Sequence, residues 1–421
     1  MGFWSVLRMV KKINKIELLV PAGDFERLKV AAAFGADAVY MGGTAFGLRA
    51  KAKNFDHKQM AEAIEYAKTR NVKTYITANI FAHNKDFEGM GDYFKQVENM
   101  GADALIISDP GVFSLAKEVV PKMPLHISTQ ANNTNYHSVA FWAEQGASRV
   151  ILARELSLEE IADIHAKIAG KIELEAFIHG SVCMAYSGRC FLSAYMNDRD
   201  ANKGECSNNC RFKYHLMEEK RQGEYFPVIS EDEGTYILNS KDLCMIQHIP
   251  EVADAGVTSF KIEGRMKTPH YVATVTKAYR KAIDDFYENY EYYNENKSLY
   301  MEEIMKSSNR DFSTGFYFGR PGAEAQIFDG STHNKTYDFV GIVKTYDAET
   351  GFAVIEQRNK FCLGDELEFL RAHKANFSQE IIEMYDNEGN AVTSAPHAQQ
   401  ILKIKVGQEV EPFDIVRMKL K

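Results

Sequence analysis

Residues 17–43 read ELLVPAGDFERLKVAAAFGADAVYMGG, in which a short apolar run and a helical stretch lead to a second apolar run. Such runs, with branched side chains and no polar alternation, are typical of strands buried on both faces of a parallel sheet. Gly35 stands just before the second run, where the end of a helix needs a left-handed residue and glycine has no Cβ to clash. The segment therefore predicts one strand–helix–strand unit of an α/β fold.

The same unit repeats along the chain to about residue 265. Nine strand candidates follow this pattern, at 17–23, 36–43, 73–80, 102–109, 125–132, 149–155, 172–180, 235–242 and 257–264. About eight alternating β and α units favour a (β/α)8 TIM-like barrel over an open sheet. Since nine is one too many, we expect the segment TYILNSKD at 235–242 to close an inserted hairpin outside the barrel.

Two segments depart from the repeat. The insertion after the seventh strand is too long for an ordinary strand-to-helix loop, and insertions of this size are usually functional. From Thr336 the pattern changes to short alternating runs separated by turn residues, which predicts a small antiparallel β-barrel. We therefore expect a TIM-like barrel at 1–305 with a cysteine-rich insertion at 181–234, a linker at 306–335 and a C-terminal β-barrel domain at 336–421.

The composition is that of a globular protein of 421 residues, 45% hydrophobic and 26% charged, with 50 basic and 58 acidic residues. This balance excludes a disordered chain, and no apolar run approaches the roughly 20 residues of a membrane helix. The amino-terminal residues lack a targeting pattern, so we expect a cytoplasmic protein with no membrane partner. The net charge of −8 does not exclude a polyanionic partner, because residues 261–280 hold five basic side chains against one acidic.

Four of the six cysteines, Cys183, Cys190, Cys206 and Cys210, lie within the insertion. Disulfides are disfavoured in the cytosol, so clustered cysteines there indicate metal ligands. Zinc and iron–sulfur clusters both accept four thiolates, but zinc sites usually have two close pairs, and only Cys206 and Cys210 form one. The wide spacing between Cys183 and Cys190 favours an iron–sulfur cluster. The alternative is that the four are unrelated small core residues.

Several motifs around the cysteines match a known family. They are EAFIHGSVC at 175–183, GRCFLS at 188–193, NSKDL at 239–243, KIEGR at 261–265 and NRDFSTGF at 309–316. With these motifs the chain resembles peptidase family U32, the collagenase-like protease family, over nearly its whole length. Within that family, residues 183–210 and 231–243 most resemble the bacterial prephenate-dependent tRNA 5-hydroxyuridine (wobble uridine) hydroxylases.

The resemblance implies an enzyme that hydroxylates the wobble uridine of tRNA to 5-hydroxyuridine. It implies prephenate as a cosubstrate, an iron–sulfur cluster of the 4Fe-4S type as cofactor, and it allows a paralogous U32 subunit as a partner. Some relatives take the fourth cluster ligand from the position of Cys244 rather than Cys210. The choice between these two residues stays open.

The older name of the family raises a second function, a peptidase with Cys183 as its nucleophile. His179, four residues earlier, is the imidazole that could serve as its base. The sequence has no H-E-x-x-H or G-x-S-x-G motif. A peptidase leaves Cys190, Cys206 and Cys210 unexplained, whereas a four-thiolate cluster uses all of them, so the hydroxylase is the favoured hypothesis.

In an α/β barrel the chemistry lies at the C-terminal ends of the strands. We expect His179 and Glu263 there as catalytic residues. The substrate-binding candidates at the same ends are Arg49, Asn79, Gln130, Asn132, Arg154 and Arg265. Guanidinium groups bind carboxylates in a bidentate manner, so the arginines suit a dicarboxylate such as prephenate. Each arginine could instead form a structural ion pair, and His179 could instead be a hydrogen-bonded core residue.

Basic side chains are spread along the C-terminal domain, at Lys344, Lys360, Arg371, Lys374, Lys403, Lys405, Arg417, Lys419 and Lys421. Small β-barrels often present such strands to RNA, which would let this domain hold tRNA outside the anticodon. A domain that only packs against the larger barrel explains the sequence equally well, so both hypotheses remain open.

Overall fold

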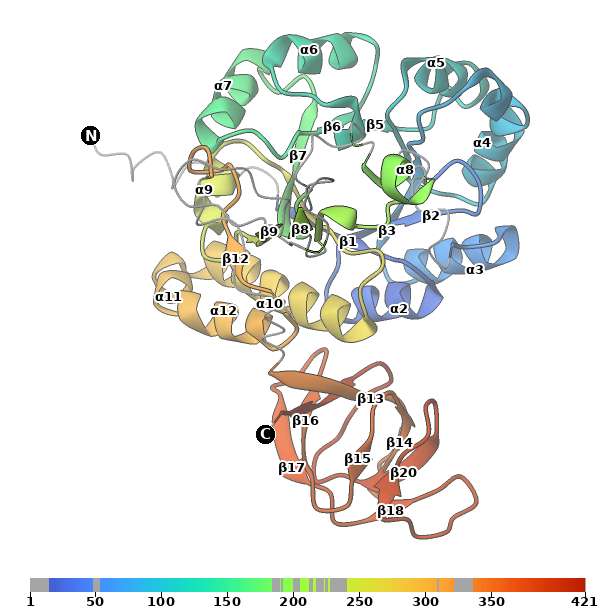
Figure 1. Ribbon diagram of the computed structural model, residues 1–421, viewed down its shortest axis with the longest axis vertical. Helices are drawn as coiled ribbons and strands as arrows, with labels where there is room; N and C mark the ends of the chain where they lie inside the picture. The colour runs from blue at the N-terminus through green and yellow to red at the C-terminus, as the bar shows by residue number, and fades with distance from the viewer. Residues whose placement is uncertain are drawn as a thin grey trace.

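The architecture comes from a computed structural model (Figure 1). It describes residues 15–47, 54–183, 190, 192–199, 205–211, 215–216, 223, 226–227, 241–308, 310–321 and 336–420. Arg49, one of the predicted substrate-binding residues, lies outside these ranges. Among the described helices, none has the length and apolar character needed to cross a bilayer.

Eight parallel strands form a closed barrel in the larger part of the molecule (Figure 1). In order around the barrel they are β1 (Glu17–Pro21), β2 (Ala38–Gly42), β3 (Lys73–Ala78), β4 (Ala104–Ile107), β5 (Leu125–Ile127), β6 (Arg149–Ile151), β7 (Glu173–Gly180) and β11 (Ser259–Ile262). Strand β11 pairs in parallel with both β1 and β7, which closes the ring. The predicted TIM-like barrel is confirmed.

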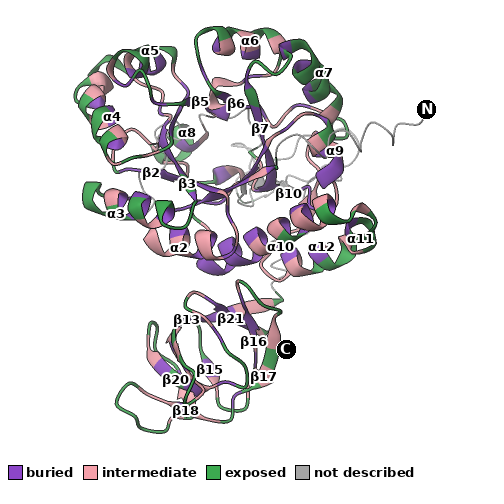
Figure 2. Cartoon of the chain, turned by 180° about the vertical axis from the view of Figure 1, so that it is seen from behind, coloured by how far each residue is buried: buried purple, intermediate pink, exposed green. Residues whose placement is uncertain are grey.

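Helices cover the outside of this barrel (Figure 2). They are α2 (Phe25–Ala33), α3 (His57–Lys68), α4 (Met90–Asn99), α5 (Pro110–Val119), α6 (Tyr136–Glu144), α7 (Leu158–Ile168), α9 (Ile249–Asp254) and α10 (Pro269–Glu288). Side-chain caps set where they begin: Asp24, Asp56 and Ser157 each accept a hydrogen bond from a backbone N–H of the first turn. Gly35, before β2, has the left-handed φ of 99° that its position predicts. These signals fix the loops that join strands to helices.

The described end of the extra strand candidate, residues 241–242, lies outside the eight-stranded barrel. Its last residue begins β10 (Asp242–Cys244), and residues 235–240 lie outside the described ranges. Strand β10 pairs antiparallel with the C-terminal end of β7 and parallel with β12 (Phe312–Ser313). The end of β7 is therefore extended beyond the barrel into a small additional sheet.

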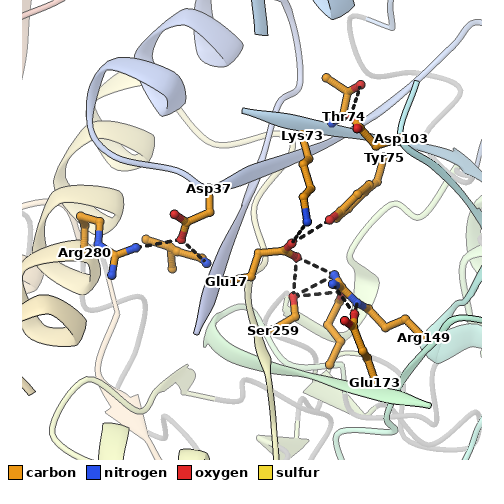
Figure 3. Close-up of polar contacts among 12 residues, drawn as sticks. Glu17, Asp37, Lys73, Thr74, Tyr75, Asp103, Arg149, Glu173, Ser259 and Arg280 are labelled. Atoms are coloured by element: carbon orange, nitrogen blue, oxygen red, sulfur yellow. Dashed lines mark hydrogen bonds and ion pairs between the residues drawn. The ribbon is translucent and has the colours of Figure 1, made fainter. Parts of the chain in front are cut away.

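The barrel interior contains a network of buried charges (Figure 3). Glu175 is fully buried and accepts hydrogen bonds from Lys261 at 2.7 Å and from Arg149 at 3.1 Å. Figure 3 shows Arg149 between Glu17 and Glu173, with which it also forms ion pairs. Burial alone would raise the pKa of Glu17, but the charge and hydrogen bond of Arg149 outweigh it and lower that pKa. Buried charges persist only when paired, so this network ties the closing strands together.

The C-terminal part is an antiparallel sheet that curves into a half-barrel (Figure 1). Across the sheet its strands are β17 (Phe377–Glu380), β16 (Glu366–Leu370), β21 (Ile415–Lys419), β13 (Tyr337–Asp347), β14 (Phe352–Gln357), β20 (Ile401–Lys405) and β18 (Met384–Tyr385). A second pair, β15 (Phe361–Cys362) with β19 (Ser394–Ala395), lies beside it. The expected small antiparallel β architecture is confirmed.

Helix α10 connects the barrel to this sheet. Lys277 of α10 donates hydrogen bonds to the backbone oxygen of Lys374 at 2.9 Å and to Asn376 at 2.7 Å. Arg417 of β21 contacts Thr274 of α10 at 3.4 Å. Beyond α10 the chain continues through α11 (Tyr290–Glu295) and α12 (Lys297–Met305) toward the sheet. Apolar packing adds to these polar contacts, because Phe339, Ile342, Leu370 and Ile415 of the C-terminal part belong to the same buried core as the barrel.

Candidate functional site

His179 lies at the C-terminal end of β7 with only 2% of its surface exposed. Its ring packs against Tyr271, Tyr279 and Phe312, at centroid distances of 5.8, 5.5 and 5.4 Å. Burial, with a smaller effect of the Lys267 charge, lowers the pKa of His179 to about 3. The imidazole is therefore neutral at pH 7 and a weak base, which fits a positioning role better than proton abstraction.

Glu263 and Arg154 face each other at the ends of β11 and β6. Oε2 of Glu263 lies 3.7 Å from Nη2 of Arg154 and 3.4 Å from the hydroxyl of Tyr40. Arg154 stacks on the ring of Phe177 at 4.0 Å and donates a hydrogen bond to the backbone oxygen of Ser181 at 2.7 Å. Its buried Nε has no hydrogen-bond partner among the described residues. The loose ion pair leaves guanidinium donors that a ligand carboxylate can take.

Arg265 reaches from the end of β11 across to β2 and β3. It donates hydrogen bonds to Asn54 at 2.7 Å and to Thr77 at 3.4 Å. The guanidinium packs on Gly42, where a Cβ would lie 2.6 Å from Nη2. A glycine at this point of β2 is therefore required for Arg265 to enter the barrel mouth.

Buried amide oxygens without partners lie just after β5. The turn η2 (Thr129–Ala131) follows this strand, and Asn132 after it is left-handed, with a φ of 56°. Oε1 of Gln130 and Oδ1 of Asn132 are buried and have no hydrogen-bond partner in the described part of the chain. Since such groups are costly unless satisfied, they are suited to a ligand. Asn79 differs, because its amide donates to Ser128 at 3.3 Å.

The four clustered cysteines form no disulfide and none is fully buried. Cys183 follows β7, and Cys190 precedes the short helix α8 (Leu192–Asn197). The sulfur of Cys206 is 3.7 Å from the hydroxyl of Ser193 in α8 and accepts the backbone N–H of Asn208 at 3.4 Å. Amide-to-sulfur bonds of this kind stabilise thiolate ligands and tune the potential of clusters.

These donors suit a cluster chemically, but the described residues do not bring them together. Within those residues, no three His, Cys, Asp or Glu side chains form a group that could hold a metal ion. Residues 184–189, 191 and 200–204 of the insertion lie outside the described ranges. The cluster ligands therefore remain a prediction.

Cys244, the alternative fourth ligand, is buried on β10 and pairs in register with His179. Burial raises the pKa of its thiol to about 11. The hydroxyl of Tyr279, from α10, donates to the backbone oxygen of Ile178 at 2.8 Å and accepts the N–H of Met245 at 3.0 Å. It also lies 3.7 Å from the sulfur of Cys244. One buried hydroxyl thus joins β7 to β10.

Several residues that shape the site were not among the candidates named from the sequence. They include Tyr40, Asn54, Thr77 and Tyr279. Tyr40 and Thr77 lie on barrel strands, where period-two alternation could have marked them as inward-facing. Nothing in the sequence around Tyr279 indicates its role. A tyrosine on the apolar face of a helix looks the same in the sequence whether or not its hydroxyl bonds a distant strand.

Two family models match the chain: peptidase family U32 at residues 23–327, and the peptidase family U32 C-terminal domain at residues 335–417. The chain belongs to peptidase family U32. The C-terminal domain of a U32 peptidase from Geobacillus thermoleovorans has been solved; it is 42% identical, and the match covers 19% of this chain and 98% of that one, with a TM-score of 0.19.

Full-length relatives within this U32 family carry two kinds of name. The tRNA hydroxylation protein P1 of Bacillus subtilis (strain 168) is 42% identical, over 96% of this chain and 95% of the relative. The tRNA hydroxylation protein P of Escherichia coli (strain K12) is 36% identical, over 94% and 95%. A collagenase of Porphyromonas gingivalis (strain ATCC BAA-308 / W83) is 32% identical, over 96% and 97%.

Proposed function

We propose that this U32 protein hydroxylates tRNA, replacing the C5–H of the wobble uridine by C5–OH, with prephenate as cosubstrate and an iron–sulfur cluster as cofactor. The observation that carries the proposal is the 42% identity to a relative named tRNA hydroxylation protein P1 along 96% of this chain. The partly accessible thiols of the insertion support it, because four thiolates are what such a cluster needs.

Cys183, Cys190 and Cys206 would hold the cluster, completed by Cys210 or Cys244. Once bound, the cluster would supply electron-transfer chemistry at the C-terminal end of the barrel. Metal ligation requires thiolates. The buried thiol of Cys244, whose pKa is raised, must lose a proton at added cost, whereas Cys210 is partly exposed.

The side chains at the barrel mouth would bind the organic substrates. Arg154 keeps guanidinium donors available for a carboxylate of the cosubstrate, and Arg265 offers a second guanidinium across the mouth. The unsatisfied oxygens of Gln130 and Asn132 would accept hydrogen bonds from substrate N–H or O–H groups. Glu263, beside Arg154, is the carboxylate placed to accept a proton there.

Mass spectrometry of tRNA nucleosides tests the activity. A strain without the gene should lack the 5-hydroxyuridine family of nucleosides, and the wild-type chain should restore them. Cys206→Ser should fail to restore them, because a hydroxyl is a poor replacement for a thiolate ligand. Cys362→Ser, on β15 in the C-terminal part, is the matched control and should restore them fully. Unchanged nucleosides in the deletion strain would contradict the proposal.

Anaerobic purification tests the cofactor independently of activity. The protein should be coloured and carry about four iron and four sulfide per chain. Cys183→Ser and Cys190→Ser should lose the iron. Comparing Cys210→Ser with Cys244→Ser assigns the fourth ligand, because only the ligand variant should lose the cluster. A colourless, iron-free protein after anaerobic reconstitution would refute the cofactor.

A paralogous U32 subunit is the proposed partner. The Bacillus subtilis strain that has protein P1 also has a tRNA hydroxylation protein P2, which is 34% identical over 73% of this chain. If the present chain needs such a partner, deleting the paralogue in its host should lower tRNA hydroxylation. An unchanged level would show that the chain acts alone.

A peptidase is the second candidate, favoured by the full-length relationship to a collagenase. The geometry weighs against it, since Cys183 is exposed while His179 is buried. The low pKa of His179, about 3, also makes it a poor base for a thiol. Gelatin cleavage by pure wild-type protein that is lost in Cys183→Ala would establish a peptidase. Absence of cleavage would rule it out.

A further inference from the structure

A pocket of about 370 Å³ opens at the N-terminal ends of the barrel strands, on the face opposite the candidate site. Lys73, Arg149 and Glu173, which line it, are the first residues of β3, β6 and β7. Figure 3 shows these side chains near one another, with Tyr75 beside them. The starts of the barrel strands and the loops that precede them therefore build the pocket.

Cationic and polar groups in this pocket lack full partners. Lys171 lines it, and its ammonium makes no ion pair or hydrogen bond within the described part of the chain. Among the described residues, the one ion pair of the Lys73 ammonium is a 3.5 Å contact with Glu17. His126 is 4% exposed, and its Nδ1 is buried without a partner in the described residues. The two ammonium groups can bind the oxygens of a carboxylate.

Acidic groups in the same pocket also keep a free oxygen. Oε2 of Glu173 accepts both hydrogen bonds from Arg149, at 2.9 and 2.7 Å, which leaves Oε1 available. Oδ2 of Asp103 accepts the N–H and the hydroxyl of Thr74, at 2.7 and 3.3 Å, which leaves Oδ1 available. The pocket therefore offers sites for a cation as well as for an anion.

The rest of the lining is apolar. The hydroxyl of Tyr75 is used by Glu17 at 2.7 Å, so that the tyrosine offers mainly its ring. Pro124 and Ile172 also line the pocket. An apolar group of a ligand can gain from contact with these surfaces.

We propose that this pocket binds a small zwitterion, an α-amino acid with an apolar side chain. Its carboxylate pairs with Lys73 and Lys171, and its ammonium pairs with Glu173 and Asp103. A zwitterion forms charge-assisted hydrogen bonds with both the lysines and the carboxylates, whereas a simple anion or a simple cation uses only one of the two sets. The site is separate from the tRNA chemistry proposed for the other face.

Isothermal titration of the full chain with L-leucine and two analogues tests this assignment. L-Leucinamide lacks the carboxylate, and 4-methylpentanoate lacks the ammonium group. L-Leucine should bind at least about tenfold more tightly than either analogue, because each missing charge removes a charge-assisted hydrogen bond. No binding of L-leucine up to about 10 mM, or equal binding of 4-methylpentanoate, would overturn the proposal.

A matched pair of variants locates the binding. Lys171→Met keeps the apolar stem and removes only the ammonium, so it should weaken L-leucine about tenfold and leave L-leucinamide unchanged. Lys68→Met, at the end of α3 and outside the pocket lining, should change neither. Both lysines are exposed, so folding should be preserved. Equal affinities of the two variants for L-leucine would overturn the assignment to this pocket.

Discussion

Replacing Arg417 by methionine should weaken the attachment of the C-terminal sheet to the barrel. Arg417 is fully buried, and its Nη2 lies 2.7 Å from Glu303 of α12 and 2.7 Å from Glu368 of β16. Its Nη1 is 3.4 Å from the hydroxyl of Thr274 in α10. One side chain therefore pairs with acids from both parts of the molecule.

The structure sets the expected size of this loss. Removing one partner of a buried ion pair typically costs about 3–5 kcal/mol, since the other charge stays buried. Here the side chains of Glu303 and Glu368 are 20% and 11% exposed, and Lys306 remains 3.2 and 3.1 Å from them. We therefore expect the lower end, about 3 kcal/mol of unfolding free energy for Arg417→Met.

The pH dependence of the loss has a definite sign. Burial would raise the pKa of Glu368, but the hydrogen bond and charge of Arg417 outweigh it, so the net pKa is lowered. A carboxyl with a lowered folded-state pKa contributes stability that is present above its unfolded pKa, about 4.3, and is lost as the pH falls through the folded value. The difference between wild type and variant should therefore shrink below about pH 4.

Urea unfolding followed by circular dichroism measures both effects. Lys374→Met is the control, because its pair with Glu409 is exposed, at 40% and 60%, and should be worth under about 1 kcal/mol. A loss below about 1 kcal/mol for Arg417→Met at pH 7 would refute the argument that this buried pair joins the two parts.

Four further predictions concern other parts of the chain. Glu175→Gln leaves the buried ammonium of Lys261 without a charged partner, so the free energy of unfolding measured in urea should fall by about 3 kcal/mol. An unchanged free energy of unfolding would mean that water reaches the pair. Gly180→Ala places a methyl group at a φ of 109° and 2.6 Å from the backbone oxygen of Glu263, so it should lower the free energy of unfolding by more than about 1 kcal/mol and lower tRNA hydroxylation. A variant as stable as the wild type would contradict this close approach. Burial and nearby cations hold the pKa of His126 well below its ordinary value, so below about pH 6.5 the imidazole is protonated in the unfolded chain but not in the folded one. The free energy of unfolding should therefore fall by up to about 1.4 kcal/mol per pH unit below about pH 6.5, and His126→Gln should remove this part of the pH dependence. Lys403→Glu should leave tRNA affinity and its salt dependence unchanged, whereas a salt slope flatter by about 0.7 or more would show that the C-terminal sheet contacts tRNA.

The sequence predicted the barrel because each strand has its own local signal. A short apolar run after a left-handed glycine, as at Gly35, marks a buried strand whatever its neighbours are. The charged interior had no such signal, since Glu17, Arg149 and Glu175 each stand near a strand end, where a charge is ordinarily solvated. Only closure of the barrel, with β11 beside β1 and β7, brings them together.

The candidate site was predictable where it follows strand ends and not where it depends on packing. Arg154 and Glu263 could be named because both follow strands, and the barrel brings them within 3.7 Å. The sequence could not tell whether this arginine serves a ligand or a structural pair, because that depends on distances of a few tenths of an ångström. The fourth cluster ligand is undecided for a similar reason, since Cys210 and Cys244 have equal chemistry and differ in burial.

The basic residues of the C-terminal domain suggested RNA binding, but the structure gives several of them other partners. Lys344 pairs with Glu356 at 2.9 Å, and Arg371 and Lys405 donate to backbone oxygens. The side chains of Lys360, Lys403 and Lys419 are exposed and form no ion pair or hydrogen bond within the described residues. The packing hypothesis is therefore the stronger one for this domain.

Helix α10 contacts both the C-terminal sheet and the strand end at the candidate site. Lys277 and Arg417 fix α10 against the sheet on one side. On its other side the same helix presents Tyr279, whose hydroxyl bonds the backbone of β7 and of the residue after β10. His179 and Cys244 lie opposite each other on those two strands. Tyr279 therefore links α10, which packs against the C-terminal sheet, to the end of β7 from which the cysteine-rich insertion departs.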